Sequence, residues 1–192
     1  MKKNKPITWL CMLCLALLSI SCVEDVDLNQ ANDIVLTPVY EADFVYSKLN
    51  TEEFIDFDID LGIIVPEIVV NDTLDYDILS SSFAVDNLEK VELYFEFYNS
   101  IEIGFTFDFI FLDSNGQIIG PSYSIPVNPG NGPDEPSVLS IPDPITLDPE
   151  LIAILGDTKQ LVTSIRVQNV SSSLQGILEL KSKGTYFVKY DL

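Results

Sequence analysis

Histidine is absent from this sequence, and cysteine is absent after residue 22. The missing imidazole excludes Ser-His-Asp and Cys-His catalysis and every histidine-based metal site. Cys11 and Cys14 lie inside an apolar run, so they indicate neither a zinc half-site nor a redox motif. No G-x-S-x-G, P-loop or G-x-G-x-x-G motif occurs either. We therefore expect a protein that is not an enzyme and has no cofactor.

Basic residues are scarce: the chain has 10 Lys+Arg against 30 Asp+Glu. Three of the ten lie at positions 2, 3 and 5, and every acidic residue follows position 23. Residues 22–192 therefore carry 7 basic and 30 acidic side chains, a net charge of −23. Such a surface repels nucleic acid phosphates, so we expect no nucleic acid partner. The simplest role of the acids is solubility and protection of sheet edges from pairing.

The amino-terminal segment has three parts. A lysine-containing start, Met1–Pro6, precedes the apolar run Ile7–Ile20, which is too short to span a bilayer and fits a secretory signal. The run ends in Leu18-Ser19-Ile20-Ser21-Cys22, which resembles the lipobox of bacterial lipoproteins, although Ser19 stands where leucine is usual. That resemblance implies cleavage before Cys22, diacylglycerol on the Cys22 sulfur and a third acyl chain such as palmitate. Two or three acyl chains anchor a protein stably to a membrane.

Acidic residues follow the cysteine in Val23-Glu24-Asp25-Val26-Asp27. This stretch resembles the export signal of surface lipoproteins in the Bacteroidota, and it is equally explained as the start of an acidic tether. We expect a signal peptide at 1–21, a tether at 22–33 and a single domain at 34–192. The expected location is the cell envelope, anchored in the outer membrane and exposed at the cell surface.

Period-two alternation of apolar and polar residues dominates the domain. It occurs at residues 55–61, 74–78, 91–97 and 105–111, the last with four phenylalanines on one face. A helix, with its period of 3.6, would scatter these residues around its surface. Asp113–Gly116 predicts a hairpin turn before a strand at 117–119, and residues 161–169, 176–183 and 185–190 predict the last strands. Asp148, Pro149 and Gly156 predict one short helix over 149–155.

Seven of the eleven prolines lie within residues 126–149, which predicts a long irregular connection. Few apolar side chains lie in 127–141, so we expect the domain to tolerate its deletion. The pattern as a whole predicts an antiparallel β-sandwich of immunoglobulin-like outline with seven to nine strands, or a partly open barrel. Residues 89–120 and 148–182 are similar to small β-sandwich lipoproteins of Bacteroidota without assigned activity, and distantly to late-embryogenesis-abundant β-sandwiches. That similarity contains no catalytic motif.

Two groups of side chains are candidates for binding. Asp56, Asp58, Asp60 and Glu67 have nearly the spacing of a calcium loop, but Leu61 replaces its glycine and the alternation favours a solvated strand face. Five tyrosines are candidates for a sugar-stacking platform, although packing explains them more simply and the tryptophan that such platforms favour is absent after Trp9: Tyr40, Tyr46, Tyr94, Tyr98 and Tyr123.

These features predict a non-enzymatic binding or structural module of the envelope, with loops at one end of the sandwich, above all 126–147, as the working surface. Its partners would be the membrane, through the lipid, and an envelope protein or glycan. A glycan- or calcium-binding accessory lipoprotein is the second hypothesis. A hydrolase with a carboxylate pair is the third, since 30 acids place some pairs together by chance.

Overall fold

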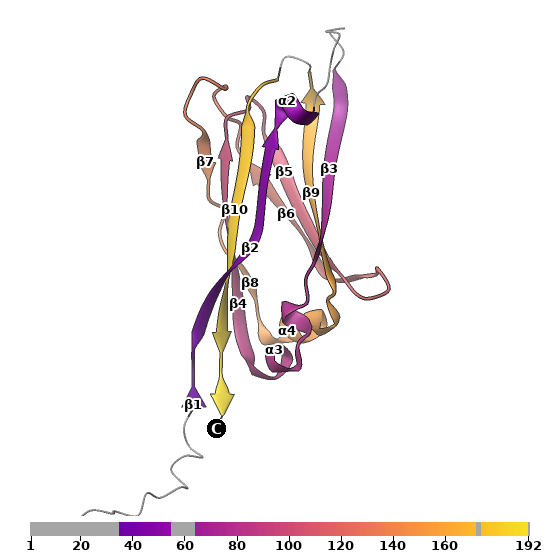
Figure 1. Cartoon of the computed structure of the whole chain (residues 1–192), viewed down its shortest axis with the longest axis vertical. Helices are drawn as coiled ribbons and strands as arrows, with labels where there is room; N and C mark the ends of the chain where they lie inside the picture. Colours follow the sequence, from indigo (N-terminus) through magenta and orange to yellow (C-terminus); the bar gives the residue numbers. More distant parts are fainter. Residues whose placement is uncertain (1–34, 55–63, 172–173, 192) are drawn as a thin grey trace, which may run out of the picture. The chain divides into compact units, whose positions relative to one another are not determined.

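The computed structural model describes residues 35–54, 64–171 and 174–191. Residues 36–190 form one structural unit with its own core. Two antiparallel sheets face each other in this unit (Figure 1), so the predicted mainly β sandwich is confirmed. Among the described residues, nine strands make up these two sheets, within the expected seven to nine.

The larger sheet has five strands in the order β2-β10-β4-β7, with β8 also paired to β4. These are β2 (Val39–Asn50), β4 (Leu88–Asn99), β7 (Val138–Ser140), β8 (Ile145–Leu147) and β10 (Ile177–Val188). The four-stranded sheet has the order β3-β9-β5-β6, with β3 (Val65–Asp75), β5 (Phe105–Leu112), β6 (Ile118–Val127) and β9 (Gln160–Val170). Two short strands, β1 (Val35–Leu36) and β11 (Tyr190–Asp191), pair with each other.

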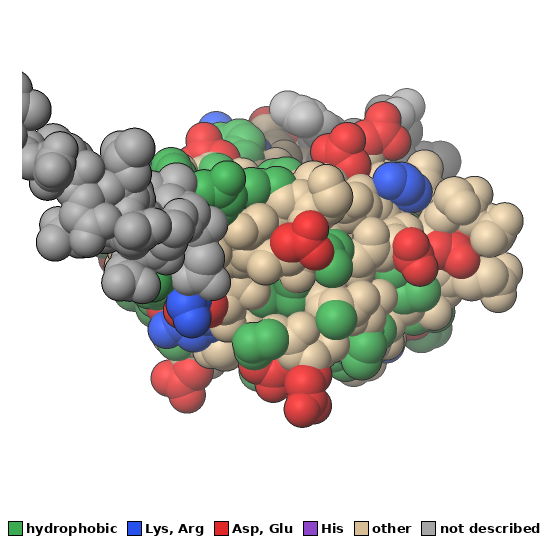
Figure 2. Space-filling view, turned by 90° about the horizontal axis from the view of Figure 1, so that it is seen from below, with side chains coloured by type: hydrophobic (Ala, Val, Ile, Leu, Met, Phe, Trp, Pro, Cys, Tyr) green, Lys and Arg blue, Asp and Glu red, His purple; other side chains and the backbone are tan. Residues whose placement is uncertain are grey.

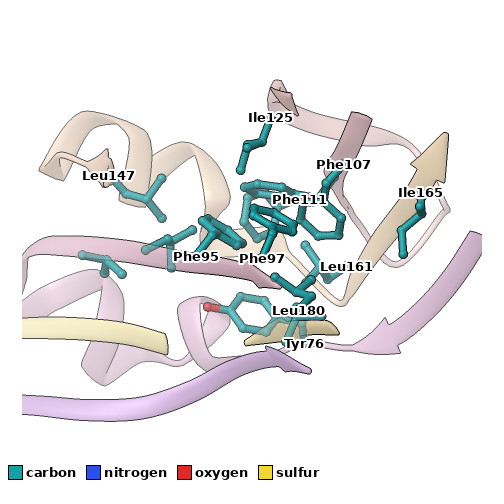
Figure 3. Close-up of a cluster of buried hydrophobic side chains, with 14 of the residues drawn as sticks. Tyr76, Phe95, Phe97, Phe107, Phe111, Ile125, Leu147, Leu161, Ile165 and Leu180 are labelled. Atoms are coloured by element: carbon teal, nitrogen blue, oxygen red, sulfur yellow. The ribbon is translucent and has the colours of Figure 1, made fainter. Parts of the chain in front are cut away.

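Phenylalanine rings from the two sheets meet in the core. Phe95 and Phe97 on β4 and Phe107 and Phe109 on β5 are at most 2% exposed. The Phe95 ring centroid lies 5.8 Å from that of Phe107 and 5.6 Å from that of Phe109. Figure 3 shows this cluster between the strands that carry it. Because burying one such side chain contributes roughly 1.5–3 kcal/mol, the alternation of β4 and β5 fixes which faces pack together.

The carboxyl-terminal pair of predicted strands is one continuous strand, so the predicted division near residue 184 is wrong. β10 runs from Ile177 to Val188 and pairs with both β2 and β4. A bulge in β2 lies opposite Ser182, where the register shifts. The Ser182 hydroxyl accepts a hydrogen bond from the Val45 N–H and donates one to the Val45 carbonyl, each at 2.7 Å. This serine satisfies the backbone groups that the bulge removes from the ladder.

The predicted strand at 74–78 is also wrong in its second half, since β3 ends at Asp75. Tyr76 turns into the core, where its N–H donates to the Lys159 carbonyl at 2.9 Å and its hydroxyl lies 3.3 Å from that of Tyr186. The chain then forms a 3₁₀ turn, Ile78–Ser80, which leaves Ile78 exposed. The predicted strand at 55–61 lies outside the described residues.

Short helices close the ends of several strands. The predicted helix is confirmed as α4 (Pro149–Ile154), with the Asp148 carboxylate accepting from the Leu151 N–H at 2.9 Å. A 3₁₀ turn, Leu155–Asp157, follows it. Two single helical turns were not predicted, α2 (Thr51–Phe54) and α3 (Ser82–Asn87), the latter capped by Ser81.

The proline-rich stretch 126–149 is irregular at 128–137 and 141–144, as predicted, but it also contributes short strands to the edge of the sandwich. β6 extends through Pro126 to the buried Val127, and β7 and β8 pair with β4. A methyl group added at Gly130 would lie 2.4 Å from the Ser100 carbonyl carbon, so backbone packs on backbone here. Proline is tolerated because β6, β7 and β8 are edge strands. This packing argues against the expectation that deleting 127–141 would spare the fold, which stays untested.

Candidate functional site

The predicted lipidation site, Cys22, and three of the four residues of the predicted calcium site, Asp56, Asp58 and Asp60, lie outside the described residues. Glu67 is described and lies exposed on the outward side of β3, 3.9 Å from the Arg166 guanidinium. Arg166 also contacts Asp108 on β5, at 2.5 Å. Across residues 35–54, 64–171 and 174–191, no group of three or more Asp, Glu, Cys or His side chains could hold a metal ion.

The five candidate tyrosines do not share one surface. Tyr123 on β6 stacks on Phe109 with ring centroids 4.5 Å apart, and burial raises its pKa to about 12. Tyr40 is opposite Tyr186 in the ladder and belongs to the inward side of β2 near the start of the strand. Tyr46, Tyr94 and Tyr98 all belong to the outward face of the five-stranded sheet, because their neighbours in β2 and β4 are buried.

This outward face, hereafter the tyrosine–lysine face, is built by strand register. Tyr46, Lys181 and Glu96 form one row across β2, β10 and β4. Directly opposed residues in antiparallel strands point to the same side, so this row brings an aromatic ring beside a charge pair. The adjacent rows contain Lys48 with Glu179 and Tyr98, Asp43 with Lys183 and Tyr94, Glu41 with Thr185 and Glu92, and Val39 with Phe187 and Lys90.

The tyrosine hydroxyls are held by carboxylates. Tyr98 donates to Glu96 at 2.8 Å, Tyr46 donates to Glu179 at 3.3 Å, and Tyr94 donates to Glu92. The bond from Tyr94, followed by one from Lys90, lowers the pKa of Glu92, and the same Glu92 bond raises the pKa of Tyr94. Both shifts keep the phenol protonated and the carboxylate charged, so the network holds at neutral pH.

Lysine ammonium groups cover two of the tyrosine rings. The Lys181 Nζ lies 4.8 Å from the Tyr98 ring centroid and 3.4 Å from Glu179. The Lys183 Nζ lies 5.5 Å from the Tyr94 centroid and 2.8 Å from Glu41. These cation–π and ion-pair contacts restrain long side chains that would otherwise lose rotamer entropy on binding.

Charge on the tyrosine–lysine face is nearly balanced, unlike the rest of the chain. Four of the seven basic residues after position 21 lie on it: Lys48, Lys90, Lys181 and Lys183. They stand beside five carboxylates: Glu41, Asp43, Glu92, Glu96 and Glu179. The face is solvent-exposed, with Tyr46 64% exposed and the Lys181 side chain 51% exposed. It combines aromatic area with fixed donors and acceptors, which suits recognition of a polar partner.

Sequence reasoning identified the outward tyrosines of β4 but missed the lysines that join them. The sequence pattern that could have revealed the lysines is the alternation Glu179-x-Lys181-x-Lys183, which places both lysines on one side of a strand. All three residues lie inside the strand predicted at 176–183, but the lysines were not considered together with the tyrosines of β4. The pairing of β10 with both β2 and β4 was not readable from any local pattern.

No family model and no curated protein matches this chain. Among solved structures, it is similar to a protein of Parabacteroides distasonis predicted to be secreted, at 10% identity and a TM-score of 0.43, covering 62% of this chain and 38% of that one. It is also similar to a structure of infectious bursal disease virus, at 9% identity and a TM-score of 0.44, covering 82% and 33%. A tailspike domain of bacteriophage CBA120 has 11% identity, a TM-score of 0.38 and coverage of 80% and 19%. The chain thus spans about a fifth to two fifths of the length of these structures.

Within the described part of the chain, no helix combines the length and the apolar character needed to cross a membrane.

Proposed function

We propose that this protein is a lipid-anchored, non-enzymatic binding module of the bacterial cell envelope, and that the tyrosine–lysine face is its binding surface. The signal and Cys22 support the anchor, and the outward face of the five-stranded sheet supports the binding role. The observation that carries the proposal is the concentration of four of seven basic residues around one exposed and two half-buried tyrosines, on a chain with a strong negative charge.

Charge balance is the physical reason for choosing this face. Elsewhere a partner would meet uncompensated carboxylates, whose desolvation opposes association. On the tyrosine–lysine face three of the four lysines, Lys90, Lys181 and Lys183, already contact a carboxylate, so a partner displaces water from charges that are paired. Tyrosine is enriched at binding hot spots because it buries a large rigid area and still makes hydrogen bonds. The proposed working surface is therefore the sheet face and not the 126–147 segment.

An envelope protein is the first candidate partner, and an envelope glycan is the second. The specific observation that favours a glycan is Tyr46, whose ring is 64% exposed and whose hydroxyl is fixed by Glu179. A ring held in this way stacks on a sugar while the neighbouring carboxylate accepts hydroxyl protons. Calcium binding receives no comparable support from the described residues, because Glu67 contacts Arg166.

The anchor is tested by replacing Cys22 with alanine in the full chain. We expect the wild-type protein to carry acyl mass at Cys22 and to sediment with membranes, and the Cys22→Ala protein to lose both properties. Wild-type protein without lipid, or beginning at another residue, would refute the anchor.

The binding surface is tested with isolated envelopes and the purified lipidated protein in detergent. The double variant Tyr46→Ala, Tyr98→Ala should reduce co-sedimentation about tenfold or more, as expected for loss of interface hot spots. Val69→Ala on the opposite sheet, where Val69 is 44% exposed, is the matched control. Protease treatment of the envelopes should abolish binding to a protein partner, and periodate treatment should abolish binding to a glycan. Equal binding by the double variant and the control would refute the proposed surface.

A further inference from the structure

Exposed apolar side chains gather at the end of the sandwich where the chain enters residues 36–190. Five of them belong to this end: Tyr40, Ile78, Phe83, Val85 and Ile154, each at least 42% exposed. We define these five as the base face. Figure 2 views the protein from this end and shows hydrophobic patches on it, with acidic side chains among them.

Contacts between distant segments show that these residues share one end. The Val188 N–H donates to the Pro38 carbonyl at 3.0 Å, and the Lys189 N–H donates to the Asn87 carbonyl at 2.8 Å. The start of β2, the end of β10 and the end of α3 therefore meet. A methyl group added at Gly156 would lie 3.1 Å from Val85, which places the turn after α4 beside α3. A hollow between these elements is almost wholly apolar, lined by Tyr40, Ala42, Ile78, Phe83, Leu88 and Tyr186 among others.

We propose that the base face dips into the membrane interface beside the lipid anchor, so that the domain sits on the bilayer with this end down. This inference rests on the proposed anchoring through Cys22. The position of the chain entry supports a membrane as the occupant. Fourteen residue steps separate Cys22 from Leu36, so the base face stays within about 50 Å of the anchor even when the chain is fully extended. A random coil of that many residues spans roughly 20 Å on average.

Such a short tether gives the base face an effective concentration at the bilayer on the order of millimolar, so even weak partitioning orients the domain. Phenylalanine and tyrosine rings are the side chains that membrane interfaces favour. Three exposed carboxylates border the face, Asp77, Asp86 and Asp157, and two exposed lysines, Lys159 and Lys189, lie at the same end. Because the carboxylates outnumber the lysines, these charges at the headgroup level oppose approach to anionic lipid. We therefore expect the contact to be strongest with zwitterionic lipid.

The chain offers a clean test because Trp9 is its only tryptophan and lies in the signal segment. The lipidated Phe83→Trp protein then carries one tryptophan, on the base face. Leu139→Trp is the matched control, because Leu139 is also exposed, at 46%, but lies far from the base face. Leu139 pairs opposite Tyr98, and Tyr98 is ten residues along β4 from Leu88, which lies at the base face. Ten strand residues correspond to roughly 33 Å. Both proteins are reconstituted into phosphatidylcholine vesicles containing acyl-brominated lipid, and vesicle flotation verifies anchoring independently.

For Phe83→Trp we expect a blue-shifted emission and quenching at least about threefold stronger than for Leu139→Trp, because brominated chains quench only tryptophan at membrane depth. Including anionic phosphatidylglycerol should reduce that quenching. Equal and weak quenching in both floated proteins would overturn the inference while leaving the anchor intact. A blue shift that increases with protein density but is not accompanied by quenching would also overturn it, because it would show that a second copy of the protein covers the base face. Failure of both proteins to float would instead refute the anchor.

Discussion

Asn99, at the end of β4, is fully buried and makes three hydrogen bonds to backbone groups. Its Nδ2 donates to the Ile103 carbonyl at 2.9 Å and to the Asn128 carbonyl at 2.8 Å. Its Oδ1 accepts from the Ile101 N–H at 2.8 Å. One side chain thus joins the β4–β5 connection to the segment after β6, and so links the two sheets at this end.

Replacing Asn99 with leucine keeps the branched outline of the side chain, makes it somewhat larger, and leaves three backbone groups without partners. A buried polar group without a partner costs about 1–3 kcal/mol, so with three such groups we expect Asn99→Leu to lose about 3–9 kcal/mol of unfolding free energy. That is a large share of the roughly 5–15 kcal/mol that stabilises a typical domain. The measurement is urea unfolding followed by far-UV circular dichroism. Asn115→Ala in the exposed β5–β6 turn is the control, with an expected change within about 0.5 kcal/mol.

Asn99→Asp refines the test because it keeps the acceptor for the Ile101 N–H but turns a carboxylate toward two carbonyl oxygens. Burial and these carbonyls should raise the carboxyl pKa, so the variant should be most stable at low pH and lose stability as pH rises through that pKa. If Asn99→Leu lost less than about 1 kcal/mol of unfolding free energy with an unchanged m-value, water would have to replace all three hydrogen bonds, and the stabilising role of Asn99 would be refuted.

Three further predictions concern other regions. Burial raises the pKa of Tyr123 to about 12, so its phenol keeps its proton in the folded state while the unfolded chain loses it from about pH 10. The free energy of unfolding should therefore fall by up to roughly 2 kcal/mol between those pH values. Tyr123→Phe should reduce this pH dependence when urea unfolding is measured at about pH 9 to 11.5. Backbone N–H groups of Gln117 and Asn115 hold the pKa of Asp113 below its usual value, so Asp113→Ala should lower the melting temperature at pH 7. That difference should shrink as pH falls through the lowered pKa of Asp113; an equal difference at pH 2 would contradict it. Millimolar calcium should leave the melting temperature unchanged relative to sodium of equal ionic strength, and a calcium-specific rise abolished by Asp58→Asn would restore the metal hypothesis.

Local alternation in the sequence determined the strand faces of the sandwich. Val91–Phe97 and Phe105–Phe111 were predicted as strands because each puts apolar side chains on one side, and both bury those side chains. The turn at Asp113–Gly116 and the capped helix α4 were equally predictable, since their hydrogen bonds join residues within four positions. Composition also excluded the histidine-dependent chemistries, and the residue pattern before Cys22 predicted a signal peptide at 1–21.

Only the tertiary structure decided which strands lie side by side. Pairing of β10 with β2 and β4 joins residues more than 70 positions apart, and this pairing builds the tyrosine–lysine face. The proline-rich segment appeared dispensable because its apolar residues are few, but Gly130 packs on the Ser100 backbone and the Asn128 carbonyl accepts a hydrogen bond from the Asn99 side chain. Tyr76 continued an alternating pattern, yet it left the strand for a hydrogen bond with Lys159 and a place in the core. Sequence period reports which side of a strand is apolar, whereas strand neighbours depend on contacts between segments that no local pattern encodes.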